Sequence, residues 1–226
     1  MRTPGCPVRP SLARGHRGRT PPAARTSALP RRGRGLKSAV VLYSIQHRCV
    51  WDQLRERGEY HGVASQVDAH WRHAYGWMRR QMQRQLGPAP AAGFMPVWAW
   101  RWWRGPARPR PDLRHRGHLR AGTAGVLLTL ELAPSRVLLS DFELWHYVLN
   151  GWYLPANRAD ERRFARGAQR PPKVRARQIE DSWRRIFRIG ELRPPYGHPL
   201  RSRAVQAVCW QLRLADVMQV REFKAR

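Results

Sequence analysis

The sequence predicts an α+β fold: a single domain with small mixed or antiparallel sheets and about four helices, preceded by a disordered N-terminal tail. Three observations support this prediction. Apolar and amphipathic stretches follow one another in the order β-α-α-β-β-β-α-α-β-β, without the regular alternation of a doubly wound fold. Hydrophobic residues make up 42% of the 226 residues, which is enough for one core. The first 37 residues differ in composition from all that follows.

The tail, residues 1–37, holds ten basic residues and no acidic one, with six prolines and five glycines. Such a segment cannot bury enough apolar surface to offset the entropy lost on ordering. We expect a disordered tail or an upstream start codon assigned in error. The Arg-rich, acid-free composition also resembles an organellar transit peptide, but no apolar stretch fits a secretory signal. The globular domain is expected to cover residues 38–226.

The chain is strongly basic, with 43 Lys and Arg against 15 Asp and Glu and a formal net charge of +28. Only three of the basic residues are lysines, and Gly, Pro and Ala are abundant. This pattern indicates the codon bias of a GC-rich genome. The positive field is real whatever its origin, so we expect weak, nonspecific binding to nucleic acid. Charged residues and a proline interrupt the longest apolar run, so no membrane span is expected.

In the N-terminal half, Ala39–Ile45 is β-branched and apolar and predicts a buried strand. Val50–Arg57 predicts a short helix that ends at Gly58. Gln66–Leu86 predicts a longer helix, because its large apolar residues recur at steps of three and four. These residues are Trp71, Tyr75, Met78 and Met82.

Phe94–Trp103 predicts a strand with alternate tryptophans on one face, and Arg104–Gly122 predicts a loop. Residues 98–120 interleave four tryptophans with seven arginines, a composition that could form a stacking platform for single-stranded nucleic acid. We expect instead that the tryptophans pack in the core and that the loop is solvated, because large apolar side chains on strands are usually buried.

The C-terminal half predicts further strands and two helices. Ser140 and Glu143 have the spacing of a capping box, which predicts a helix from Ser140 to about Asn150. The polar stretch 157–173 is expected to be a surface excursion, partly helical. The other predicted elements are strands at Gly125–Leu132, Val137–Leu139, Val205–Leu212 and Gln219–Lys224, a helix at Val174–Arg188, a loop at Arg193–Arg203 and a turn at Leu214–Met218.

The sequence contains no phosphate-binding loop, dinucleotide fingerprint, nucleophile elbow or zinc-protease motif. The pairs His70/His73 and His115/His118 lack the Cys or acidic neighbours of a zinc site, apart from Asp112 beside the second pair, and we expect no metal. Three widely spaced cysteines form no Cys-x-x-Cys pair, and a cytoplasmic location is expected.

A few polar residues stand in apolar or basic surroundings and are candidates for a cleft. We expect Asp112 to pair with Arg110 or Arg114, and Asp141 to stabilise a helix N-terminus. An amide in an apolar strand must find partners or line a cavity, which singles out Gln46, Gln206 and Gln211 among the strand residues. The candidate cleft-lining residues are Gln46, Asp112, Arg114, His146 and Gln206.

The run from Val40 to Arg226 resembles a mainly bacterial family, the domain of unknown function 3841. This resemblance names a family and implies no established activity. The matching stretches are LYSIQ (42–46), PVWAW (96–100), RPDLR (110–114), VLLSDFELWHYVLNGWYLP (137–155) and VQAVCWQLRLADVMQVREFKAR (205–226).

The opening strand, the short helix and the following Gly58 and Tyr60 are also similar to the start of ADP-ribosyltransferase-like domains. That resemblance implies an NAD ligand in a cleft between two sheets, with Gln46 gripping the nicotinamide ribose. Gln206 or Gln211 would stand where the family carries a polarising Glu or Gln. The late strand contains no Glu, so the carboxylate that stabilises an oxocarbenium-like transition state is missing.

Three functions therefore remain open. The first is an ADP-ribosyltransferase-like domain that binds NAD or another nucleotide, with or without turnover. The second is a non-catalytic protein that binds a partner. The third is a basic module that binds RNA or single-stranded DNA through the Trp/Arg segment. The sequence does not indicate which oligomeric state the protein adopts.

Overall fold

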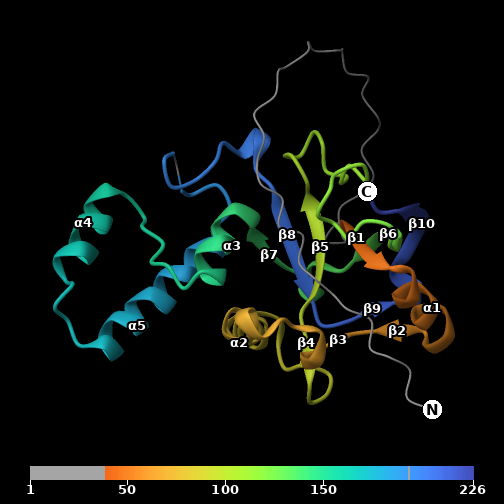
Figure 1. Cartoon of the computed structure of the whole chain (residues 1–226), viewed down its shortest axis with the longest axis horizontal. Coiled ribbons are helices and arrows are strands. Elements are labelled where there is room, and N and C mark those ends of the chain that lie inside the picture. The colour runs from red at the N-terminus through yellow and green to blue at the C-terminus, as the bar shows by residue number, and fades with distance from the viewer. Residues whose placement is uncertain (1–38, 193) are drawn as a thin grey trace, which may run out of the picture.

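A computed structural model describes residues 39–192 and 194–226; the expected tail, residues 1–37, lies outside the described residues. The described chain is α+β, as predicted (Figure 1). Its centre is a six-stranded sheet in the order β10-β6-β1-β5-β8-β7, in which every pair of neighbouring strands is antiparallel. These strands are β1 (Val40–His47), β5 (Val97–Trp102), β6 (Ala124–Leu132), β7 (Leu138–Asp141), β8 (Val205–Cys209) and β10 (Val217–Lys224).

Two short ribbons and five α-helices complete the described chain. The ribbons pair β2 (Glu59–Tyr60) with β9 (Leu212–Arg213) and β3 (Gly62–Val63) with β4 (Phe94–Met95). The helices are α1 (Arg48–Arg57), α2 (Arg72–Leu86), α3 (Phe142–Leu149), α4 (Arg158–Arg166) and α5 (Pro172–Ser182). No helix of the described residues combines the length and the apolar character needed to cross a membrane.

One face of the sheet, which we name the α1 face, packs against α1. Leu42 and Leu128 project from neighbouring strands and contact Val50 and Leu54 of the helix in one buried cluster. Gly58 ends α1 in the left-handed conformation, and its N–H bonds to the carbonyl of Leu54, as the sequence predicted. This face is a closed apolar layer over the middle strands.

The opposite face, which we name the α3 face, is rich in aromatic residues. Trp98 and Val208 pack with Tyr75 of α2 and Trp145 of α3, and the turn after α5 adds Trp183. Trp98, Trp100 and Trp103 are all buried, so the prediction that the tryptophans pack in the core is confirmed for these three. Their rings are not an open platform for stacking bases. Trp102 is half-buried, and the register with β8 shifts between Trp100 and Trp102.

The predicted capping box at Ser140 is wrong. Ser140 is part of β7, where it pairs with Gln206 of β8, and its hydroxyl makes no hydrogen bond within the described chain. Asp141 is the N-cap instead, and its carboxylate accepts a hydrogen bond of 3.2 Å from the Leu144 N–H. The strand extends two residues beyond the predicted end at Leu139, to Asp141, and the cap moves by one position.

Two further boundaries differ from prediction, and the expectation of a partly helical stretch at 157–173 is confirmed. The long helix begins at Arg72 and is preceded by two 3-10 turns. The polar stretch 157–173 contains the whole of α4, which Asn157 caps by accepting from the Asp160 N–H. The late strand divides into β8 and β9 around Trp210 and Gln211. In each case local capping or a change of pairing partner determines where the element ends.

A buried ion pair joins the start of α3 to the start of β8. Asp141 and Arg203 have side chains 1% exposed, and Arg203 Nη1 donates to Asp141 Oδ2 at 2.9 Å. The other two guanidinium nitrogens, Nε and Nη2, donate to the carbonyls of His198 and Leu192. Each nitrogen of this buried cation therefore donates to an oxygen, which satisfies the condition for keeping a charge inside a protein.

Gly105, in the loop after β5, packs against the backbone at Arg203 and so contributes to the same junction between α3 and β8. Its N–H bonds to the Arg203 carbonyl at 3.0 Å, and a Cβ at this position would lie 1.9 Å from the Arg201 carbonyl oxygen. The φ of +82° adds to the requirement for glycine. Any residue with a side chain at position 105 would therefore prevent the loop after β5 from packing against the start of β8.

We expect Asp141→Asn to lower the free energy of unfolding by about 3–5 kcal/mol, because Arg203 would remain buried without its counter-charge. Asn can still cap α3, so the loss reports on the ion pair. Urea denaturation measures it. The matched control is Asp112→Asn, which removes an exposed partner of Arg114 and should cost less than about 1 kcal/mol. Equal losses in the two variants would contradict this assignment.

We expect the thiol of Cys209 to resist alkylation in the folded protein. The side chain is 2% exposed, and burial raises its pKa to about 12, so at pH 8 only about one molecule in ten thousand carries the reactive thiolate. Iodoacetamide labelling at pH 8, followed by peptide mass spectrometry, should modify Cys209 in urea but not in buffer. Comparable labelling in both conditions would show that the strand opens readily.

Candidate functional site

Six aromatic side chains form a continuous cluster on the α3 face, which we name the aromatic cluster. Its members are Trp100, Trp103, Phe142, His115, His118 and His146. Trp100 is central: its ring centroid lies 4.6 Å from that of Trp103 and 4.8 Å from that of Phe142. Beyond these rings lie His118, 5.0 Å from Trp103, and His146, 4.9 Å from Phe142. A strand, a loop and a helix thus each contribute to one aromatic surface.

The histidine tautomers in this cluster follow from their partners. His146 Nδ1 lies 3.1 Å from the Phe142 carbonyl, and a carbonyl can only accept, so Nδ1 carries the proton. The Nε2 of neutral His146 then presents a lone pair. His118 Nε2 donates in the same way to the Asp112 carbonyl at 2.9 Å. Burial lowers the pKa of His118, which keeps that ring neutral near pH 7.

Two buried polar atoms without partners lie next to the aromatic cluster. Ser140 of β7 and Gln206 of β8 are cross-strand neighbours, and Gln206 is also paired with Trp100 of β5. Ser140 is 0% exposed and Gln206 4%, yet Ser140 Oγ and Gln206 Oε1 make no hydrogen bond within the described chain. Leaving such an atom unpaired costs about 1–3 kcal/mol. A pair of them side by side calls for an explanation, such as a bound water or a ligand that supplies the missing partners.

Further unpartnered polar atoms occur on the same face. The indole nitrogen of Trp145 and Nδ1 of His115 are buried without a hydrogen bond in the part of the chain that the structure describes. Burial raises the pKa of Tyr75, an effect that the neighbouring Trp98 indole partly offsets. Unmet hydrogen-bonding capacity is thus concentrated over β5, β7 and β8.

Asp112 and Arg114 lie at the outer edge of this region, on the loop after β5. The Asp112 carboxylate accepts from Nε and Nη2 of Arg114 at 3.0 and 2.9 Å. These bonds lower the pKa of Asp112 to about 2, so the group is ionised at any physiological pH. The predicted pairing of Asp112 is confirmed with Arg114 as the partner. The contact fixes a solvent-exposed turn whose backbone holds His118.

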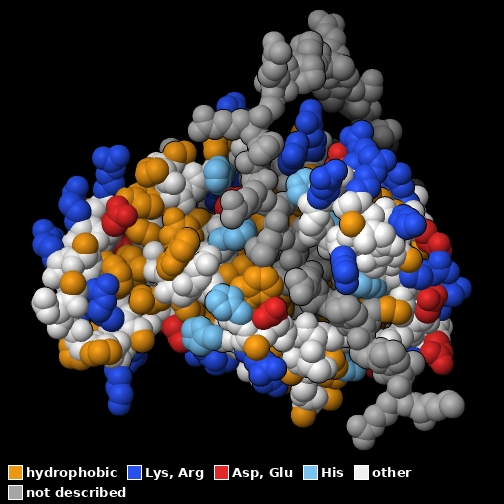
Figure 2. Space-filling model, viewed as in Figure 1, with side chains coloured by type: hydrophobic (Ala, Val, Ile, Leu, Met, Phe, Trp, Pro, Cys, Tyr) orange, Lys and Arg blue, Asp and Glu red, His pale blue; other side chains and the backbone are white. Residues whose placement is uncertain are grey.

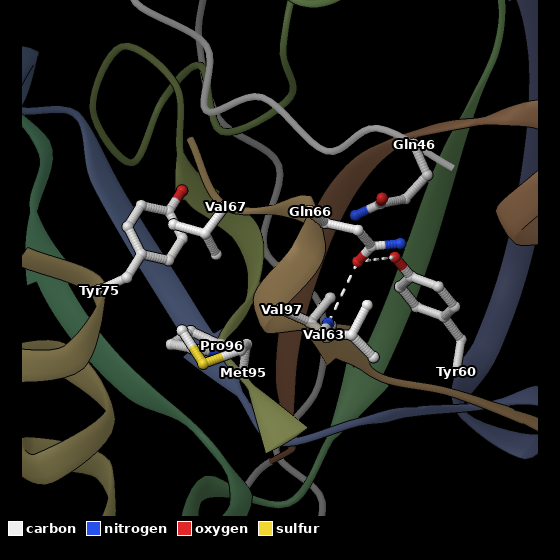
Figure 3. Close-up of a pocket in the computed structure, with 10 residues that line it drawn as sticks. Gln46, Tyr60, Val63, Gln66, Val67, Tyr75, Met95, Pro96 and Val97 are labelled. Atoms are coloured by element: carbon white, nitrogen blue, oxygen red, sulfur yellow. Dashed lines mark hydrogen bonds between the residues drawn. The ribbon is translucent and has the colours of Figure 1, made fainter. Parts of the chain in front are cut away.

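Gln46 belongs to a different region, a small cavity at the end of β1 (Figure 3). Its amide nitrogen donates to Ser44 Oγ at 2.8 Å, and Ser44 in turn donates to the Trp98 carbonyl at 2.9 Å. Across the cavity, Gln66 Oε1 accepts from the Tyr60 hydroxyl and the Val63 N–H. The cavity measures about 10 Å³, which is room for a single water. It is too small for a nucleotide.

The structure brings four of the five predicted cleft residues to one side of the sheet and leaves one apart. His146 belongs to the aromatic cluster and Gln206 adjoins it at Trp100. Asp112 and Arg114 border the cluster at His118, whose ring bonds to the Asp112 carbonyl. Gln46 is in register with Val97 on the α1 face, whereas Gln206 shares the opposite face with Trp100. The two glutamines therefore do not meet in one cleft.

Ser140 is a site residue that sequence reasoning assigned to another role. Its spacing from Glu143 mimics a helix cap, and only the pairing of β7 with β8 shows that the hydroxyl faces Gln206. His115 was likewise expected to lie in a solvated loop, whereas Trp103 was expected to pack in the core, as it does. A signal was present in the sequence, because residues 98–118 combine tryptophans with histidines, but this signal does not distinguish packing from exposure.

Within the described residues, no group of three or more His, Cys, Asp or Glu side chains is arranged to hold a metal ion. Asp141 is engaged by Arg203 and Asp112 by Arg114. The polar groups in and next to the aromatic cluster are an amide, a hydroxyl and imidazoles. This composition suits the recognition of an organic ligand by hydrogen bonds and ring contacts.

The comparisons with known proteins identify the family. No curated protein and no solved structure matches the chain. A family model described as "Domain of unknown function (DUF3841)" matches residues 41–218. This range runs from β1 into β10 and includes every residue of the aromatic cluster. The chain therefore belongs to the family of the domain of unknown function 3841.

Proposed function

We propose that this chain is a nucleotide-binding domain whose ligand, NAD or a related nucleotide, binds on the α3 face beside the aromatic cluster. The observation that carries the proposal is the pair of unpartnered atoms Ser140 Oγ and Gln206 Oε1 next to Trp100. A fold that served stability alone would gain by replacing them with apolar side chains of the same shape. Their retention is explained if a ligand completes their hydrogen bonds.

The chemistry of these groups fits a nucleoside. The Gln206 carbonyl accepts a hydrogen bond, so its counterpart is a carboxamide N–H, an exocyclic amine or a ribose hydroxyl. Ser140 both donates and accepts. His146 Nε2 offers a second acceptor close to Phe142. Neutral donors and acceptors beside aromatic rings are the usual means of holding a base and a sugar.

The loop after β5 supplies positive charge for phosphates. It is attached to the aromatic cluster by the hydrogen bond of 2.9 Å from the Trp103 N–H to the Pro109 carbonyl. Arg108, Arg110 and Arg116 form no ion pair within the described residues. Arginine is the side chain best suited to phosphate oxygens, because its planar group donates two parallel hydrogen bonds.

The proposal is binding, without a commitment to turnover. In the resemblance to ADP-ribosyltransferase-like domains, the late strand polarises the reacting sugar, and here that strand carries Gln206. An amide cannot provide the negative charge that an oxocarbenium-like transition state needs. The nearby carboxylates are engaged by Arg203 and Arg114. A sensor or carrier of nucleotides is consistent with this set of residues.

We expect NAD or ADP-ribose to raise the melting temperature of the full-length protein, because a ligand that binds only the folded state stabilises it. At a concentration 100 times the Kd the gain is about 2.7 kcal/mol. Differential scanning fluorimetry with NAD, ADP-ribose and nicotinamide, followed by calorimetric titration, measures it. No shift with any of the three at millimolar concentration would contradict the proposal.

A matched pair of variants locates the site. Gln206→Leu should weaken binding by at least about tenfold while leaving stability unchanged or higher, because it removes a buried carbonyl that lacks a partner in the free protein. Gln46→Leu lies on the opposite face and should leave the Kd unchanged, although it breaks the bond to Ser44 and lowers stability. The reverse result, with binding lost only in Gln46→Leu, would place the ligand on the α1 side.

A further inference from the structure

The helical hairpin of α4 and α5 carries a concentration of positive charge that the general arginine content does not explain. Residues 162–177 contain seven basic residues and no acidic one. The overall composition, 43 basic residues in 226, would place about three in a segment of this length. The hairpin projects from one end of the sheet, and Lys and Arg side chains extend from that end of the surface (Figures 1 and 2).

Part of this charge is used to build the hairpin. Asp160, whose side chain is 9% exposed, contacts Arg163 at 3.2 Å and Arg185 at 3.1 Å. Arg175 lies 4.1 Å over the ring of Phe164, which stacks on Tyr153 at 3.8 Å. These contacts fix the two helices against each other. They account for the arginines on the inner side of the hairpin.

The outer basic residues have no such role. Arg162, Arg166, Arg170 and Lys173 are exposed and form no ion pair with an acidic group of the described chain. A stability role would have paired them with carboxylates. Instead, four neighbouring cations repel one another, a cost that a bound polyanion would remove.

The surface at the hairpin turn is hollowed, and two of these four residues, Arg166 and Arg170, line the hollow. A furrow of about 530 Å³ is lined by Arg163, Arg166, Gly167, Gln169, Arg170 and Pro171. A second hollow of about 290 Å³ shares Arg163 and Arg170 with it and extends toward Gln178 and Arg185. The described walls of the furrow contain no acidic residue. The furrow is therefore a basic channel at the hairpin turn, whereas the lining of the second hollow also includes the carboxylates of Asp160 and Asp181.

We propose that the α4–α5 hairpin binds the phosphate backbone of a nucleic acid. A polymer fits better than a small anion because the channel is shallow and its side chains are solvated, so each single contact is weak. Repeated phosphates engage several such contacts at once and release condensed counterions. The furrow holds arginines and an amide, which suit phosphate and sugar contacts that carry no sequence information. This site is separate from the nucleotide site beside the aromatic cluster.

The test is a salt series on the full-length protein. Binding of a fluorescent 20-nucleotide RNA and of the same sequence as duplex DNA is measured by anisotropy between 50 and 300 mM NaCl. The variant R162Q/R166Q/R170Q should weaken binding at least about tenfold at low salt. It should also reduce the slope of log K against log salt by about 2–3, one unit for each phosphate that the variant no longer neutralises. Glutamine keeps helix propensity, and circular dichroism confirms the fold.

The control removes the same amount of charge elsewhere. R57Q/R84Q/R221Q neutralises three exposed arginines on α1, α2 and β10, and it should change the affinity less than threefold. Equal losses in the two triple variants would show a response to net charge alone and overturn the proposal. Loss only in R108Q/R110Q/R116Q would transfer the binding to the loop after β5 and overturn it as well. Equal competition by pyrophosphate and by RNA at the same phosphate concentration would indicate a small-anion site instead.

Discussion

The position of the aromatic cluster depends on the buried contact between Asp141 and Arg203. Asp141 ends β7 and caps α3, and Arg203 lies two residues before β8. The pair therefore fixes the helix that carries Phe142 and His146 relative to the strand that carries Gln206. The hydrogen bond from the Phe142 N–H to the Ala204 carbonyl, at 3.1 Å, continues the same junction. A chain with apolar residues at both positions could pack as tightly, but it would lose the directional bonds that set this geometry.

On the α3 face, tightly packed aromatic side chains lie beside buried polar atoms that lack hydrogen-bond partners. These two features have opposite effects on the stability of the fold. Trp98 and Trp145 supply much of the apolar surface that the fold buries. Ser140 and Gln206, on the neighbouring strands, reduce the stability that this packing provides. Natural proteins retain such local costs at binding sites, where a ligand returns the lost hydrogen bonds. The α1 face, closed by leucines and valines, shows how the same sheet packs where no such site is needed.

Much of the architecture could be predicted from the sequence because it depends on local patterns. The alternation of tryptophans after Phe94 gave the correct face for Trp98 and Trp100, and Gly58 gave the correct end of α1. The failures arose where a distant partner decides the outcome. Ser140 has the local form of a cap, but pairing with Gln206 keeps it in the sheet. The six-strand order also depends on long-range pairing, which residue patterns along the chain do not contain.

The candidate site shows the same division. The sequence singled out Gln206, His146, Asp112 and Arg114 as polar residues in unusual surroundings, and these lie on or beside one surface. Gln46 was grouped with them as another amide in an apolar strand and through the resemblance to ADP-ribosyltransferase-like domains, but strand register puts it on the other face. The first helix of the hairpin, α4, was expected only as a polar, partly helical surface excursion, whereas α5 lies mostly within the helix predicted at Val174–Arg188. Arginine pairing with Asp160 and ring stacking at Phe164 hold the hairpin together.

The strand β10 forms one border of the central sheet, and its outer edge pairs with no strand of the described residues. An open border of this kind is a template for strand addition, the first step of amyloid-like association. Here Arg221, Glu222 and Lys224 interrupt the border at close intervals, and Glu222 is held by Arg48 of α1 at 2.5 Å. A strand that paired with β10 would have to remove water from charged side chains along most of its length. The unpaired backbone N–H and C=O groups of β10 can therefore face solvent, even in concentrated solution, while the charged side chains disfavour polymerisation.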